Sequence, residues 1–243
     1  MPRLVFAAAG PEGERIAERE VLIEAPTALD AVERAWAWAA AHAVTHGECL
    51  GLVGMLAPDA TRPTDGDEFG GWFAEGDLDQ FRAWVKPNDE LAAIRAELAA
   101  SASPTDRPGW YTGVLSFAYG LDDPPVVNEV CVVLFAAPTA RAALTKAHAW
   151  GAEHAAPEGY VFLGLTRLEQ VAGGEPRDGS ELIAWPLDSS RAEALAHVLH
   201  PTELQAVRFE GLDGMRPLGA LMTEAERRRF LRLTGNDDCE RGS

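Results

Sequence analysis

The chain has 243 residues, of which 47% are hydrophobic and 24% are charged, values that exclude a largely disordered chain. Its 38 acidic and 21 basic residues give a net charge of −17. This charge opposes binding to nucleic acids and to anionic membrane surfaces, and it favours a basic protein partner.

The first part of the chain predicts the element order β-β-α-β-β. Thr27 is a helix N-cap residue, and Asp30 completes a capping box with it, so a helix should run from there to about His42. The strands are expected at Arg3–Ala9, Arg19–Glu24, Cys49–Leu56 and Phe69–Ala74. Trailing helices are expected from Asp77 to Val85 and from Asp89 to Ala100.

After a Pro/Ser-rich linker at residues 101–109, the same order returns. The second helix begins after Thr139 and ends near His154. The matching strands are Trp110–Tyr119, Val130–Phe135, Tyr160–Leu168 and Glu181–Trp185. Ser190 with Glu193 predicts a trailing helix that ends near His200, and Thr223 with Glu226 predicts a last helix.

The two halves are copies of one another. Residues 25–47 align without a gap on residues 137–159, and their shared residues include Pro, Trp, His and Gly as well as the common Ala. After one inserted residue, Trp72 aligns with Trp185. We therefore predict an α+β protein of two tandem ββαββ modules, each a four-stranded, mostly antiparallel sheet with a helix across one face. The expected division is 1–100 for the first module, 110–200 for the second and 201–243 for a C-terminal extension.

The second copy resembles a family of small bacterial α+β domains of unknown function. The resemblance is carried by Trp110 and Tyr111 in the first strand, Glu129 at the head of the second, the helix APTARAALTKAHAWG and the FLGL segment at Phe162–Leu165. It implies the fold, here as a tandem duplication, and it implies no activity, cofactor or catalytic residue.

The helix positions shared by both copies form one face. Ala31, Ala35, Trp38 and His42 share a stripe at helical spacing, as do Ala143, Ala147, Trp150 and His154. We interpret these stripes as core faces, with a ligand patch of Trp and His as the alternative. The first helix has a second apolar face at Leu29, Val32 and Trp36, so we expect Trp36 to be buried against the 78–85 helix or the second module. His148, its counterpart, should be accessible. The structural or interface candidates are thus Trp36, Trp38, His42, Trp72, Trp84, Trp150, His154 and Trp185.

No catalytic or metal-binding motif is present in the sequence. Asp65, Asp67 and Glu68 could form a calcium site, but a solvated loop explains them more simply. Glu18, Glu20 and Glu24 alternate along a strand, which an exposed face explains more simply than paired-carboxylate chemistry. Cys131 lies in an expected buried strand, where a thiol is usually inert.

The cysteines, Cys49, Cys131 and Cys239, have the spacing neither of a disulfide framework nor of a zinc site. No apolar run reaches the roughly 18 residues of a membrane helix. We therefore expect a cytoplasmic, bacterial protein without cofactor or metal. The favoured function is a non-catalytic, acidic interaction protein, such as an immunity-like or regulatory scaffold. The alternative is a small-molecule enzyme or sensor with a pocket between the modules.

Overall fold

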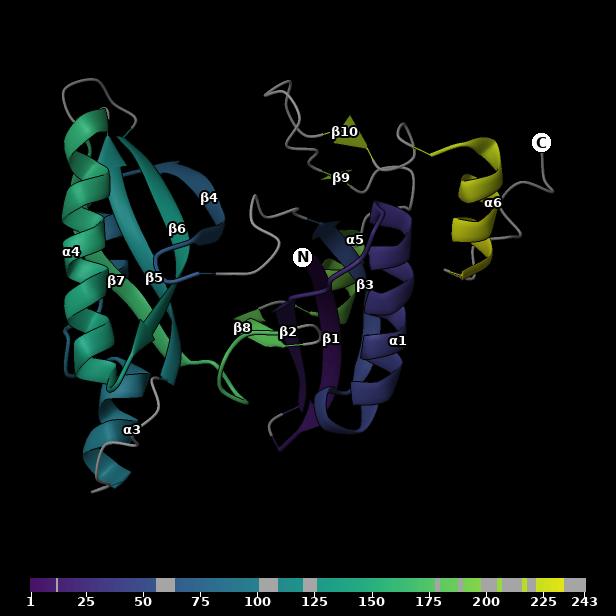
Figure 1. The fold of residues 1–243 in the computed structure, drawn as a ribbon, viewed down its shortest axis with the longest axis horizontal. Helices are drawn as coiled ribbons and strands as arrows, with labels where there is room; N and C mark the ends of the chain where they lie inside the picture. The colour runs from purple at the N-terminus through teal and green to yellow at the C-terminus, as the bar shows by residue number, and fades with distance from the viewer. Residues whose placement is uncertain are drawn as a thin grey trace. The chain divides into compact units, whose positions relative to one another are not determined.

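The computed structural model describes residues 1–11, 13–55, 64–100, 109–119, 126–177, 180–187, 190–197, 205–206, 216–217 and 222–233. Its antiparallel sheets and helices confirm an α+β protein, and they divide between two compact units (Figure 1). Unit 1 comprises Met1–Thr61 and Arg177–Ser243, and unit 2 comprises Arg62–Pro176. Within the described ranges, no helix is both long enough and apolar enough to cross a membrane.

Unit 1 is built on a sheet with the strand order β10-β9-β3-β1-β2-β8. Helix α1 covers one face of this sheet, where Leu4 and Phe6 pack against Val32 and Trp38. On the opposite face Ala194 of α5 packs with Val5 and Ile16. The elements are β1 (Pro2–Gly10), β2 (Gly13–Val21), α1 (Ala28–His46), β3 (Glu48–Met55), β8 (Glu181–Leu187), α5 (Arg191–His197), β9 (Gln205–Ala206), β10 (Arg216–Pro217) and α6 (Glu224–Leu233).

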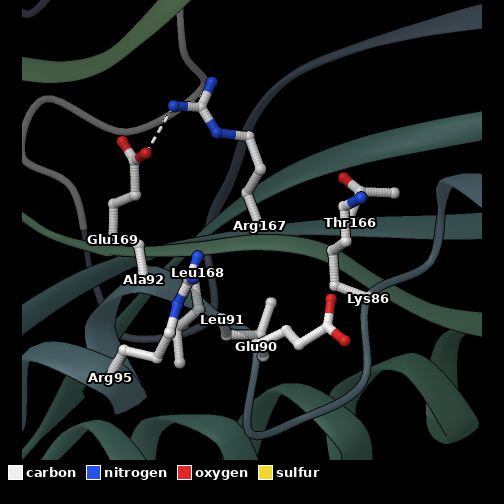
Figure 2. Close-up of a pocket in the computed structure, with 9 residues that line it drawn as sticks. All are labelled: Lys86, Glu90, Leu91, Ala92, Arg95, Thr166, Arg167, Leu168 and Glu169. Atoms are coloured by element: carbon white, nitrogen blue, oxygen red, sulfur yellow. Dashed lines mark hydrogen bonds and ion pairs between the residues drawn. The ribbon is translucent and has the colours of Figure 1, made fainter.

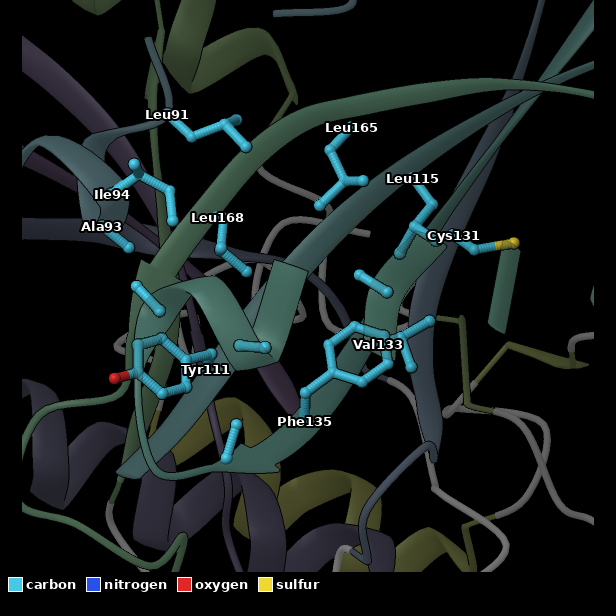
Figure 3. Close-up of a cluster of buried hydrophobic side chains, with 14 of the residues drawn as sticks. Leu91, Ala93, Ile94, Tyr111, Leu115, Cys131, Val133, Phe135, Leu165 and Leu168 are labelled. Carbon is cyan, nitrogen blue, oxygen red and sulfur yellow. The ribbon is translucent and has the colours of Figure 1, made fainter. Parts of the chain in front are cut away.

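Unit 2 has a four-stranded antiparallel sheet in the order β4-β6-β5-β7. Its core lies between the sheet and helix α4, and Leu91 and Ile94 extend it beside Leu168 (Figure 3). The elements are β4 (Glu68–Gly76), α2 (Leu78–Trp84), α3 (Ala92–Ala100), β5 (Gly109–Tyr119), β6 (Val126–Ala137), α4 (Ala140–Glu158) and β7 (Val161–Gln170).

Each sheet includes one strand from the other of the two expected modules. Strand β4 follows β3 along the chain but pairs with β6, whereas β8 follows β7 but pairs with β2. The expected modules at 1–100 and 110–200 are therefore not the compact units of the structure. The physical reason is that β4 and β8 have similar sequence patterns, so the pattern does not determine which sheet edge each strand pairs with, and an open edge must be paired or covered.

The exchanged strands have the same register in both sheets. Ala184 of β8 lies opposite Arg19, and Gly71 of β4 lies opposite Cys131. Each pairing also shifts register at its start, beside Glu181 and Glu68. The two four-stranded sets are thus equivalent strand by strand, although the chain threads through them in an exchanged order.

The helices α1 and α4 begin where the sequence predicts, whereas the bounds of the second strand differ from the predicted ones. The Thr27 and Thr139 hydroxyls cap α1 and α4 by accepting the backbone N–H of Asp30 at 3.2 Å and of Ala142 at 3.1 Å. Strand β2 runs over Gly13–Val21 and not over Arg19–Glu24, because it forms a hairpin with β1 that closes at the Gly10–Gly13 pair. Residues 101–108 of the expected linker and most of the 201–222 segment lie outside the described residues.

Candidate functional site

Each of the two repeat helices holds a stacked Trp–His pair. The Trp38 and His42 rings stack with centroids 4.2 Å apart, and the Trp150 and His154 rings stack at 4.6 Å. An aromatic residue of the first strand of each set, Phe6 or Phe117, meets the tryptophan edge-on. Both pairs therefore lie on the sheet-facing side of their helix, as the shared stripe predicted.

In unit 2, the loop before β4 is fixed to α4 and β6. The Trp150 indole N–H donates to the Gly66 carbonyl at 3.1 Å, which ties the loop to the stacked pair. Asp65 pairs with Lys146 at 2.5 Å and accepts the backbone N–H of Ala136 at 2.9 Å. These contacts make Asp65 an anchor of the loop and place Glu68, the first residue of β4, beside the stacked pair.

Glu68, Cys131 and His154 come together at this place. A carboxylate oxygen of Glu68, the Cys131 sulfur and a ring nitrogen of His154 all lie within 4.8 Å of one another. They come from β4, β6 and α4, so only the tertiary fold assembles them. Cys131 is fully buried, and its sulfur lies at the margin of the core cluster (Figure 3). We call these three residues the Glu–Cys–His cluster.

Burial disfavours ionisation of two members of the cluster, Cys131 and Glu68. It raises the pKa of the Cys131 thiol far above its usual range, and the carboxylates of Glu68 and Glu129 raise it further. The thiol also hydrogen-bonds to the Glu68 carboxylate. Burial likewise raises the pKa of Glu68, against the opposing effects of the Cys131 hydrogen bond and of His154. By itself, Cys131 is therefore a hydrogen-bonding thiol and a poor nucleophile.

Unit 1 fills the equivalent place differently. Arg19 occupies the register position of Cys131, and its guanidinium pairs with Glu181 at 2.5 Å. His46 lies 3.3 Å from the other carboxylate oxygen of Glu181. The guanidinium also lies 6.0 Å from the centre of the Phe6 ring. In unit 1, then, a side chain of the protein supplies the positive charge beside the glutamate.

The other expected interface residues are scattered. Trp84 is 38% exposed, Trp36 is half-buried, and Trp185 donates its indole N–H to Glu20 at 3.3 Å. Trp72 pairs with Val130 in the β4–β6 ladder, and its side chain lies outside the described part of the structure. The structure thus stacks Trp38 on His42 and Trp150 on His154.

Two buried carboxylates are an unexpected feature of unit 1. Glu18 and Glu20 were expected on an exposed strand face, but they are only 8% and 4% exposed. Arg3 pairs with Glu18 at 2.5 Å and lies 3.7 Å from Glu20. Their alternation with Arg19 resembles that of a solvated strand, so the sequence pattern alone gives no signal of their burial.

A pocket of about 210 Å³ lies within unit 2 between α3 and β7 (Figure 2). Its charged residues are of both signs, and Arg167 pairs with Glu169 along β7. The lining residues are Lys86, Glu90, Leu91, Ala92, Arg95, Thr166, Arg167, Leu168 and Glu169. The volume is below the roughly 300–1,000 Å³ of most small-molecule sites, so the pocket suits a single side chain better than a large ligand.

Comparison with known proteins finds no protein-family model, no curated protein and no solved structure that matches this chain.

Proposed function

We propose that the protein is a non-catalytic binding protein that recognises a basic, arginine-containing segment of a protein partner. The observation that carries this proposal is Trp84, which ends α2 with 38% of its surface exposed. The buried Phe81 holds the indole edge-on, with ring centroids 5.1 Å apart. A fixed, exposed tryptophan is the kind of side chain that dominates binding energy at protein interfaces.

The charge of the segment that carries Trp84 favours a basic partner. Exposed carboxylates outnumber exposed cations between residues 75 and 90: Glu75, Asp77, Asp79, Asp89 and Glu90 against Arg82 and Lys86. A guanidinium can stack on an indole and pair with carboxylates at the same time. The net charge of −17 attracts such a partner over longer distances. The wide cysteine spacing favours a cytoplasmic setting for this interaction.

The test uses a labelled hexa-arginine peptide, with hexa-glutamate as the negative probe, in fluorescence anisotropy at physiological salt. We expect the parent protein to bind hexa-arginine only. Trp84→Ala should weaken this binding about 10-fold, the loss expected when an interface anchor is truncated. Glu90→Gln should weaken it by a smaller factor, because one of several attracting carboxylates is lost.

Matched variants separate this surface from general charge attraction. Leu98 of α3 is 58% exposed, so Leu98→Ala removes a comparable apolar side chain. Glu175→Gln removes the same charge as Glu90→Gln from another exposed position of unit 2. Both controls should bind like the parent. The proposal fails if hexa-arginine does not bind, or if Trp84→Ala and Leu98→Ala bind it equally well.

A further inference from the structure

We propose that Glu68, Cys131 and His154 form a binding site for a divalent transition-metal ion, and that Zn²⁺ is the ion this site fits best. One carboxylate, one thiol and one imidazole are the side chains that bind zinc, and three protein ligands with one open position are a common zinc arrangement. Calcium and magnesium instead prefer sites made only of oxygen atoms. The sulfur and the imidazole therefore select against these two ions.

The geometry needs only a small adjustment. The three donor atoms lie within 4.8 Å of one another, and tetrahedral zinc holds its ligand atoms about 3.5 Å apart. Cys131 is fixed in the core. The His154 ring is held by its stack on Trp150 and by the Phe117 ring, whose centroid lies 5.1 Å from its own. Glu68 is partly desolvated but still reaches the surface, so its side chain can move toward the other two ligands and gives the ion a path from solvent.

The comparison of the two units supplies a second, independent observation. In unit 1, Arg19 stands at the position of Cys131 and pairs with Glu181, the counterpart of Glu68. In unit 2, by contrast, no lysine or arginine of the described ranges forms an ion pair with Glu68. A bound cation in unit 2 would take the electrostatic role that the guanidinium has in unit 1. On binding, the sulfur–hydrogen bond of Cys131 breaks, a sulfur–metal bond forms and the proton passes to solvent.

The experiment uses the full-length chain and Co²⁺ as a spectroscopic probe, because cobalt replaces zinc and its bond to a thiolate gives charge-transfer absorption in the near ultraviolet. We expect this band to grow to one equivalent of Co²⁺ and to disappear when Zn²⁺ is added. Cys131→Ser should abolish the band. Glu68→Gln should weaken Co²⁺ binding at least about 10-fold, as the loss of metal-site groups typically does.

Cysteine controls make the assignment specific. Cys49→Ser and Cys239→Ser should keep the band, because the proposal assigns the metal-bound thiolate to Cys131 alone. Circular dichroism checks the fold of each variant, and the Glu68→Gln result decides the case if Cys131→Ser does not fold. A parent protein without the band, a band that survives Cys131→Ser, or Glu68→Gln binding Co²⁺ as tightly as the parent would each overturn the proposal. These outcomes are independent of peptide binding at Trp84.

Discussion

Glu20 carries its carboxyl group into a buried environment on the face of the unit 1 sheet opposite α1. The indole N–H of Trp185 donates to one carboxyl oxygen, and the other has no hydrogen-bond partner within the described ranges. Arg3 lies 3.7 Å away but contacts Glu18 more closely, at 2.5 Å. Burial outweighs the attraction of Arg3 and raises the pKa of Glu20 to about 7.

This raised pKa predicts a pH-dependent loss of stability. The folded protein binds the Glu20 proton more tightly than the unfolded chain does, in which the pKa of Glu20 is 4.5. The stability that the protonated Glu20 contributes is therefore fully present below pH 4.5, and it is lost as the pH rises through about 7. Glu20→Gln cannot ionise. Between pH 4 and pH 8.5 the variant should therefore gain roughly 3 kcal/mol of unfolding free energy relative to the parent.

Urea unfolding at a series of pH values measures this gain. Glu175→Gln, at an exposed position, serves as the control and should follow the parent at every pH. If the stability curves of Glu20→Gln and the parent remain parallel across the range, the pKa of Glu20 is the same in the folded and the unfolded chain, which contradicts this prediction.

Helices α1 and α4 differ on the side away from their Trp–His stacks. Leu29 and Val32 of α1 are buried, and Trp36 packs half-buried against the same cluster, which Met222 joins from the C-terminal part of unit 1. Helix α6 lies beside α1, where Arg229 pairs with Glu33. Within unit 1, the second apolar face of α1 is therefore covered by Met222 and helix α6.

Because Met222 and α6 cover this face of α1, we expect truncation of Trp36 to lower the stability of the protein. Trp36→Ala should lower the free energy of unfolding by about 2–3 kcal/mol, less than for a fully buried tryptophan, because the ring is only half-buried. His148, its counterpart in α4, is half-buried, so it keeps part of the expected access to solvent: its ring meets Phe162 edge-on and its Nε2 lies 3.3 Å from Oδ1 of Asn88.

His148→Ala should cost about 1 kcal/mol, since it loses one neutral hydrogen bond and a ring contact. Denaturant unfolding of both variants measures the difference. Equal losses would show that α6 and Met222 do not protect the second face of α1.

The exchange of β4 and β8 decides which segments of the chain contain all the strands of a sheet. Residues 62–176 contain all four strands of the unit 2 sheet in one continuous segment. Residues 110–187, the ββαββ part of the expected second module, lack β4 and carry β8, whose partner β2 is in unit 1. We therefore expect the fragment 62–176 to unfold cooperatively with protected strand amides.

The fragment 110–187 is the matched comparison, because it contains the same five elements that the repeat predicts. With its β6 edge unpaired, it should show no cooperative unfolding and a tendency to aggregate. Circular dichroism melting and hydrogen exchange distinguish the two fragments. A cooperative 110–187 fragment would mean that β8 can replace β4 on β6, so that the exchange is not required for folding.

The local elements of this protein follow from its sequence. The N-cap threonines, the apolar stripes and the similar strand segments of the two halves are short-range patterns, and they predicted an α+β fold with the Trp–His pairs on the core side of each helix. The sequence could not indicate the features that depend on the pairing of strands that are far apart along the chain. The sequence does not show the exchange of β4 and β8, because the two strands have interchangeable patterns. It does not show the burial of Glu18 and Glu20, because Arg3 and Trp185 contact them from other strands. The Glu–Cys–His cluster has no sequence motif for the same reason: its three residues come from β4, β6 and α4, and only the pairing of β4 with β6 brings Glu68 to Cys131.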